Sequence, residues 1–190
     1  MSNALISFLK QFHPIPANDE PLITSAMEHR AYKEGDYLFK AGKVCRELFF
    51  VCKGILRIVV DNENGNEVTH FFVCENKFCS ILNSFNNHVT ANENIQAACD
   101  VEVLAISRAN LDKLYIQLPY LTPLITQITH QALLDKIAVR NAYLGQDSTT
   151  RYKTFMCNQP DIMAKVPLSD IASYLGITPQ SLSRIRKNIR

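Results

Sequence analysis

The sequence predicts an α+β protein. An N-terminal antiparallel β-roll of the jelly-roll type, with flanking helices, should be followed by a long helix and a small all-α helix-turn-helix domain. Three observations predict this architecture. Residues 32–106 contain short runs rich in β-branched and aromatic residues, separated by glycines. Residues 121–144 keep a helical pattern of apolar residues without a break. The residues after 147 form short helical patterns with a net positive charge.

The β-roll is expected from four strand-like runs and the turns between them. The runs are YLF, ELFFVCKGILRIVV, EVTHFFV and VEVLAI. Between the second and the third, Asn64-Gly65 predicts a hairpin, because a type I′ turn needs a positive φ at both central residues. Many short strands with glycine turns, and no helices between them, are typical of a sandwich or roll.

Two apolar stripes run along the predicted long helix. One contains Leu121, Ile125, Ile128 and Ala132, and the other contains Leu134, Ile137, Asn141 and Leu144. A helix that is apolar on two faces must bury both of them. We expect one face to pack on the β-roll and the other on a second copy of the same helix, which predicts a homodimer. The alternative is a helix enclosed by its own chain.

The charge distribution points to an anionic partner. Residues 1–150 contain 13 Lys and Arg against 16 Asp and Glu, a net charge of −3. Residues 151–190 contain 7 against 2, a net charge of +5. A basic end favours nucleic acid or an acidic surface as the partner.

Other functional classes find no support in the composition. The six cysteines and five histidines show no C-x-x-C pair and no zinc spacing, so we expect buried, reduced thiols and neither a metal nor a cofactor. No nucleophile or acid–base pair is recognisable, so no catalytic residue and no enzymatic activity are predicted. The absence of a long apolar run and of a signal-peptide pattern predicts a cytoplasmic protein without a membrane span.

The final segment, LSDIASYLGITPQSLSRIRKNIR, has the spacing of a helix-turn-helix. Gly176 permits the left-handed turn, Thr178 is a good N-cap, and Pro179 suits the first turn of the second helix. The outward positions of that helix are polar and end in cations, a pattern typical of DNA-reading helices. The residues predicted to contact DNA are Thr178, Gln180, Ser181, Ser183, Arg184, Arg186 and Lys187.

Four motifs extend this interpretation to the whole chain. They are YKEGDYLFKAGK at the entry to the roll, the strand pair ELFFVCKGILRI, the hinge DSTTRY and the terminal SDIASYLGITPQSLSRIRK. With these motifs the chain resembles the Crp/Fnr superfamily of bacterial transcription regulators. The resemblance implies a cyclic-nucleotide-binding-like sensor domain at 1–118, a dimerisation helix and hinge at 119–146, and a DNA-binding domain at 147–190.

The phosphate cassette departs from that family. Members that bind cyclic AMP hold the ribose with a glutamate and the phosphate with an arginine. The aligned motifs here are Ser80-Ile81-Leu82 and Ala91-Asn92, so isoleucine replaces the glutamate and alanine replaces the arginine. On the long helix, the two hydroxyl residues that meet the adenine become Lys136 and Ile137. A buried phosphate without a cation is costly, so we expect no response to cyclic AMP.

A ligand pocket is still expected at this place in the fold. Its predicted residues are Ser80, Ile81, Leu82, Ala91, Asn92 and Lys136. Two interpretations remain open: the pocket holds a different, less charged effector, or side chains such as Ile81 and Leu82 fill it. Lys136 either supplies a cation to such a ligand or is solvated beside the dimer interface.

The predicted function is a homodimeric, sequence-specific DNA-binding regulator of transcription. Gln180 and Arg184 are the expected base readers, since glutamine suits adenine and arginine suits guanine. The residues expected to contact phosphates are Thr178, Ser181, Arg186 and Lys187. The expected partners are double-stranded DNA with an inverted repeat, a second copy of the chain, and RNA polymerase. The alternative is a small-molecule sensor whose basic end docks a protein.

Overall fold

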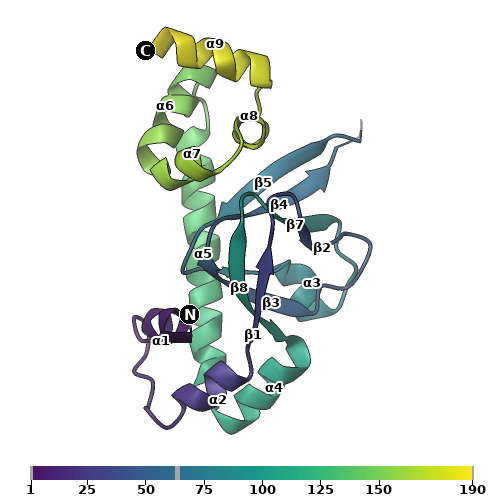
Figure 1. The fold of residues 1–190 in the computed structure, drawn as a ribbon, viewed down its shortest axis with the longest axis vertical. Coiled ribbons are helices and arrows are strands. Elements are labelled where there is room, and N and C mark those ends of the chain that lie inside the picture. Colours follow the sequence, from purple (N-terminus) through teal and green to yellow (C-terminus); the bar gives the residue numbers. More distant parts are fainter. Residues whose placement is uncertain (1, 63–64, 190) are drawn as a thin grey trace.

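The computed structural model describes residues 2–62 and 65–189, with a β-roll between N-terminal helices and a helical C-terminal region (Figure 1). The elements in chain order are α1 (Ser2–Leu9), α2 (Glu20–Ser25), β1 (Glu28–Tyr32), β2 (Tyr37–Phe39), β3 (Glu47–Lys53), β4 (Leu56–Asp61), β5 (Glu67–Val73), β6 (Phe78–Cys79), α3 (Leu82–Asn87), β7 (Glu93–Ala97), β8 (Val101–Ser107), α4 (Arg108–Gln117), α5 (Leu121–Tyr143), α6 (Ser148–Asn158), α7 (Pro160–Lys165), α8 (Leu168–Leu175) and α9 (Pro179–Ile189). The predicted fold class is confirmed.

The roll consists of two four-stranded antiparallel sheets, with strand orders β1-β8-β3-β6 and β2-β7-β4-β5. In the first sheet, β8 lies between β1 and β3, and Ala105 is the register partner of both Glu28 and Phe49. In the second, β4 lies between β5 and β7, and Leu56 is opposite Val73 and Ala97. The four strand-like runs of the sequence correspond to β2, to β3 with β4, to β5 and to β8.

Two glycine turns shape the roll. Gly54, between β3 and β4, has a φ of 86°, and a Cβ added there would lie 2.4 Å from the carbonyl oxygen of Asp100. Only glycine fits at this position. In the turn between β4 and β5, Asn64 lies outside the described residues, and Gly65 has a φ of 74°. The Gly65 amide donates to the carbonyl oxygen of Asn62 at 2.9 Å.

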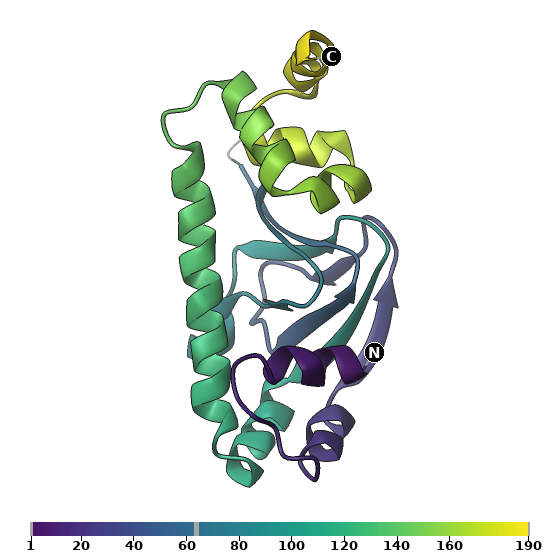
Figure 2. The same cartoon turned by 90° about the vertical axis from the view of Figure 1, so that its left-hand side faces the viewer.

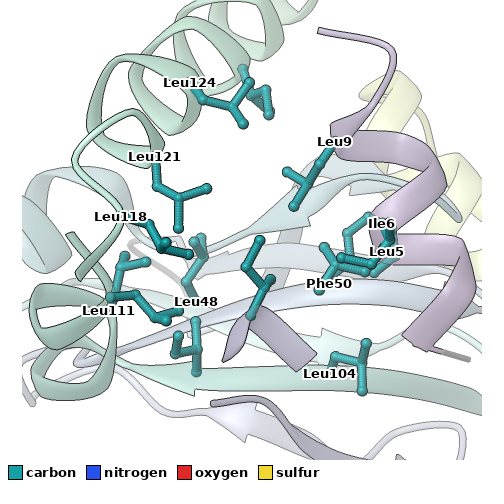
Figure 3. Close-up of a cluster of buried hydrophobic side chains, with 14 of the residues drawn as sticks. Leu5, Ile6, Leu9, Leu48, Phe50, Leu104, Leu111, Leu118, Leu121 and Leu124 are labelled. Carbon is teal, nitrogen blue, oxygen red and sulfur yellow. The ribbon is translucent and has the colours of Figure 1, made fainter. Parts of the chain in front are cut away.

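Strand β3 is buried on both faces and therefore links two parts of the core. Phe49 and Val51 pack inside the roll, whereas Leu48 and Phe50 pack against the helices outside it. The helices α1, α4 and α5 meet over this outer face, and their buried residues include Leu5, Leu9, Leu111, Leu121 and Leu124 (Figure 3).

Helix α5 extends from the bottom of the roll to the C-terminal helices (Figures 1 and 2). Its first turns bury Leu121, Leu124 and Ile128. Further along, Ile137 is exposed, as is Leu144 just after the helix. The first predicted stripe therefore supplies most of the face that packs on the roll, although Ala132 at its end is exposed. The second stripe is uncovered in the single chain.

The C-terminal helices share a core with the roll. Tyr152, Phe155 and Ile171 of the helices cluster with Ile55 and Phe72 of the roll. Helix α6 begins at an Asp147 cap, whose carboxylate accepts hydrogen bonds from the two amides that follow Ser148, at 2.8 and 3.0 Å. The α5–α6 connection is therefore a capped turn rather than a free linker.

All six cysteines are free. Cys45 and Cys79 are buried, and burial raises the pKa of the Cys79 thiol to about 12, which leaves it unreactive at neutral pH. The prediction of buried thiols is wrong for Cys157, which α6 presents to solvent, and Cys52, Cys74 and Cys99 are only half-buried. Within residues 2–62 and 65–189, no His, Cys, Asp and Glu cluster suited to a metal occurs, and no helix is long and apolar enough to cross a membrane.

Candidate nucleic-acid interface and ligand pocket

Helices α8 and α9 and the turn between them form the predicted helix-turn-helix. Gly176 follows α8 with a φ of 68°, and its amide donates to two carbonyl oxygens in the last turn of α8. Thr178 Oγ1 accepts a hydrogen bond from the Ser181 amide at 3.1 Å, and the two hydroxyls lie 2.9 Å apart. The left-handed glycine ends one helix and the threonine cap starts the next. As a result, α9 lies across the outer end of the domain (Figure 1).

Helix α9 is buried on one side and open on the other. Leu182 is buried, and Ile185 and Ile189 pack against the same core. Of the residues predicted to contact DNA, the exposed ones are Thr178, Gln180, Ser183, Arg184 and Lys187, and the half-buried ones are Ser181 and Arg186. All seven lie on α9 or at its cap. None of the three cations forms an ion pair with another described residue; the pairs of this domain are made by Lys165 and Asp170.

A buried arginine joins the helix-turn-helix to the roll. Arg57, on β4, is only 7% exposed. Its guanidinium donates to Gln96 Oε1 at 2.7 Å and to Thr69 Oγ1 at 3.0 Å, both within the roll. It also pairs with Glu67 at 2.8 Å and with Asp170 of α8 at 3.0 Å. One cation of the roll thus bridges a carboxylate of its own domain and a carboxylate of the helix-turn-helix.

Further contacts surround this bridge. The Thr69 amide donates to Ser173 Oγ at 2.9 Å, the rings of Phe72 and Tyr174 lie 5.1 Å apart, and Lys165 Nζ lies 2.8 Å from a Glu75 oxygen. Partial burial raises the pKa of the Asp170 carboxyl, although the Arg57 charge acts in the opposite direction. The bridge therefore holds Asp170 in a place where an unpaired carboxylate is unfavourable.

Three of the predicted cassette residues, Ile81, Ala91 and Asn92, line a cavity of about 290 Å³ beside the second sheet. It is lined by Val60, Ile81, Asn83, Ser84, Thr90, Ala91, Asn92 and Glu93. No lysine or arginine of the described chain is among them. The Ser84 hydroxyl is already engaged, because it donates to the Val89 carbonyl oxygen at 2.5 Å and accepts from the Cys45 amide at 2.8 Å. An anion bound in this cavity would therefore have no counter-ion among the lining residues.

A second cavity, of about 330 Å³, lies between the roll, the N-terminal segment and α5. Ser80, Ile81, Leu82 and Lys136 lie on its wall, whereas Ala91 and Asn92 do not. The structure therefore divides the predicted pocket residues between two neighbouring cavities, and Ile81 is common to both. Ile137, the neighbour of Lys136, is exposed on α5 and lines neither.

Known proteins share this architecture. Residues 29–117 match the cyclic nucleotide-binding domain family. The chain is 24% identical over 177 residues to the cAMP-activated global transcriptional regulator Vfr of Pseudomonas aeruginosa, covering 84% of this chain and 81% of Vfr. The c-di-GMP-responsive global regulator CLP of Xanthomonas campestris has a similar structure, with a TM-score of 0.71, 17% identity and coverage of 92% and 91% of the two chains. A Eubacterium rectale protein assigned to the crp/fnr family of transcriptional regulators gives a TM-score of 0.73 at 15% identity, with 96% and 87% covered.

Residues 29–117 thus resemble a cyclic nucleotide-binding domain, and the chain has the fold of Crp/Fnr-type regulators. Within this fold, the sequence interpretation missed two features. One is Arg57, whose only signal was a single cation inside the apolar run ILRIVV. The other is the contribution of Phe8, Phe12 and Phe71 to the second cavity, which no sequence pattern near the cassette indicated.

Proposed function

We propose that the chain acts as a homodimer, binds a specific inverted-repeat DNA site through α9, and does not respond to cyclic AMP. The observation that carries the DNA-binding proposal is the open face of α9, where polar side chains and unpaired cations lie together. Gln180 and Arg184 have the donor and acceptor groups to read adenine and guanine in the major groove. Thr178, Ser181, Arg186 and Lys187 would contact phosphates, which set the register on the DNA without reading its sequence. RNA polymerase is a further expected partner.

The exposed stripe of α5 supports the dimer. Leu133 and Ile137 lie on the side of the helix opposite the buried Leu124 and Ile128 respectively, since nine residues correspond to about two and a half turns, and the exposed Leu134 lies beside them. An apolar stripe on a long helix is efficiently covered by a second copy of itself. Such a dimer carries two α9 helices related by a two-fold axis.

The first prediction concerns DNA selection. Sites selected from random duplex DNA should contain an inverted repeat with half-sites about one helical turn apart. Arg184→Ala should weaken the free energy of DNA binding by about 1–3 kcal/mol and should relax the sequence preference at one base position, because a bidentate base contact is lost. Lys187→Ala should weaken binding to all DNA sequences alike and should make the affinity less dependent on salt concentration, because it removes a phosphate contact. Selection followed by salt titration of both variants measures this.

Arg46→Ala is the matched control, because Arg46 is an exposed cation on the roll, just before β3. It should leave both the selected site and the salt slope unchanged. If no repeat emerges and the two α9 variants behave alike, the basic helix is a docking surface for an acidic protein and the DNA-reading proposal is wrong.

The second prediction concerns cyclic AMP. Isoleucine and alanine occupy the positions that would need a glutamate and an arginine, and the cavity they line contains no cation. Burying the cyclic phosphate there would leave it unpaired, so the dissociation constant should exceed about 1 mM. Titration calorimetry on the full chain checks this, with Vfr measured alongside as the positive control. Micromolar binding by this chain would overturn the prediction.

A further inference from the structure

One arginine of α6 joins the α5–α6 turn to the end of α8. The guanidinium of Arg151 donates through Nη1 to the Leu175 carbonyl oxygen at 2.7 Å and through Nη2 to the Gln146 carbonyl oxygen at 3.1 Å. Gln146 lies in the turn that follows α5 (Figure 2), and Leu175 is the last residue of α8. The Thr154 hydroxyl of α6 also donates to Gln146 Oε1, at 3.2 Å. Three segments of the chain therefore meet at Arg151.

The guanidinium lies at a helix end, where a cation is favourable. The last carbonyl groups of a helix have no partner within that helix and carry a partial negative charge. An arginine that donates to one of them satisfies its hydrogen bond and interacts favourably with the helix dipole. Gly176, in the turn toward α9, also lies beside the guanidinium, because a Cβ added there would be 3.6 Å from Arg151 Nη1. Arg151 therefore caps α8 at the point where the chain turns toward α9.

Arg151 has no acidic partner, and one of its nitrogens is unsatisfied. No ion pair of the described residues involves it. The Asp147 carboxylate, one turn earlier in the chain, accepts hydrogen bonds from the residues that it caps. Among the described residues, only Arg151 Nε is a buried side-chain nitrogen or oxygen without a hydrogen-bond partner. A buried N–H without a partner is unfavourable. The surrounding elements thus hold the guanidinium on the two carbonyl oxygens at the expense of Nε.

We propose that Arg151 is a positioning residue for DNA recognition, which fixes α9 relative to α5 by holding the α5–α6 turn and the end of α8 together. Helix α5 is the helix of the proposed dimer, and α9 begins at Pro179, four residues after Leu175. In a dimer, the separation of the two recognition helices determines the spacing of the half-sites. Arg151 therefore determines which spacing the dimer accepts. The inference rests on the proposed function, but it assigns Arg151 no contact with DNA.

The spacing of the half-sites measures this role. Fluorescence anisotropy compares the selected inverted repeat with the same repeat after one base pair is inserted or removed. A single base pair changes both the separation and the relative rotation of the half-sites, so the unmodified protein should bind the altered repeats about tenfold more weakly. With Arg151→Met this discrimination should fall to about threefold or less, because α9 can then adjust to the new spacing. A loss of stability alone would leave the ratio unchanged.

Two further variants separate the shape of the side chain from its charge. Lysine keeps the charge but lacks the planar fork that reaches two carbonyl oxygens, so Arg151→Lys should tolerate the altered spacings as Arg151→Met does. Lys153→Met, at an exposed lysine of the same helix, is the matched control and should keep the full discrimination. Arg151 would be a phosphate contact, and the proposal wrong, if Arg151→Lys restored the discrimination. The same conclusion would follow if Arg151→Met weakened all spacings alike and made the affinity less dependent on salt concentration.

Hydrogen–deuterium exchange without DNA separates this inference from the proposed function. In Arg151→Met, the amides of residues 176–178 should exchange faster than in the unmodified protein, because the turn is no longer tied to α6. The amides of β3 should exchange as before, which shows that the variant is folded. Unchanged exchange at residues 176–178 would overturn the inference and leave the proposed function intact. A protein that selects no inverted repeat would instead refute the proposed function, and the positioning role with it.

Discussion

Replacing both Ile137 and Leu144 with aspartate should convert the proposed dimer into a monomer. The two side chains are 47% and 68% exposed in the single chain and lie on the uncovered stripe of α5. In a symmetric dimer each substitution occurs twice, so four carboxylates would be desolvated at one seam, at a cost of several kcal/mol. Light scattering at micromolar concentration should then give 21.5 kDa, against twice that mass for the unmodified protein.

Ala142→Asp is the matched control for this variant. Ala142 is exposed near the same end of α5, but it lies about 140° around the helix from Ile137. Its carboxylate should leave the dimer intact. The doubly substituted monomer should also lose its preference for an inverted repeat over a single half-site, because its two α9 helices are no longer tied together. A 21.5 kDa mass for the unmodified protein would refute the dimer outright.

Arg57→Leu should cost about 3–5 kcal/mol in the free energy of unfolding. The substitution removes the shared partner of Glu67 and Asp170 and leaves both partly buried carboxylates without a cation. Breaking a buried pair by deleting one member is strongly destabilising for this reason. Because Asp170 belongs to α8, the C-terminal helices should also loosen from the roll. Denaturant unfolding gives the free energy, and limited proteolysis near residues 144–147 reports the loosening.

Arg30→Leu is the matched control for the arginine bridge. Arg30 also pairs with two carboxylates, Glu28 and Glu47, at 2.8 Å. Both partners lie within the roll, however, and the arginine side chain is 28% exposed, so its loss should cost less than about 1 kcal/mol. Equal losses of stability from the two substitutions would show that Arg57 contributes no more than a surface cation does and that the bridge does not hold the domains together.

The pH dependence of the Arg57→Leu variant gives a separate test. Burial already raises the pKa of Asp170, and removing the arginine removes an opposing influence. A carboxyl with a raised pKa favours the folded state while it is protonated, and this contribution is lost as the pH rises through that pKa. The stability difference between the variant and the unmodified protein should therefore shrink as the pH is lowered below the ordinary range of aspartate. Unfolding curves at a series of pH values measure it.

Local signals were sufficient for the long helix and the helix-turn-helix, but the expectation of no helix between the strands of the roll is wrong, because α3 lies between β6 and β7. The predicted helix at 121–144 matches α5, which ends at Tyr143. The left-handed φ of Gly176 and the Thr178 cap occur where glycine and threonine predicted them. These features depend on the backbone freedom of glycine and on a hydroxyl that reaches an amide three residues away, and both lie within one turn of chain. The five strands of the four predicted runs were likewise evident from their β-branched and aromatic residues.

Strands without such a pattern were not evident from the sequence. β7, with the sequence ENIQA, is buried at four of its five positions, yet it contains a glutamate, an asparagine and a glutamine. The Gln96 side chain is satisfied there by Arg57 of the adjacent strand and by the Gly35 carbonyl oxygen. A polar residue can occupy a core strand when its partners come from distant parts of the chain, and no local pattern identifies those partners.

The sequence by itself determined the fold class, the place of the long helix, the helix-turn-helix and the loss of the cassette cation, because each depends on residue type and short spacing. Only the tertiary structure decided which residues surround the cassette that lacks this cation. It brought Asp170 to Arg57 across 113 positions of the chain, and it set Lys136 of α5 over Phe71 of β5 beside a cavity that the N-terminal phenylalanines help to close. Ion pairs and cavities form between surfaces that folding brings together, so their chemistry depends on the packing of whole elements rather than on neighbours in the sequence.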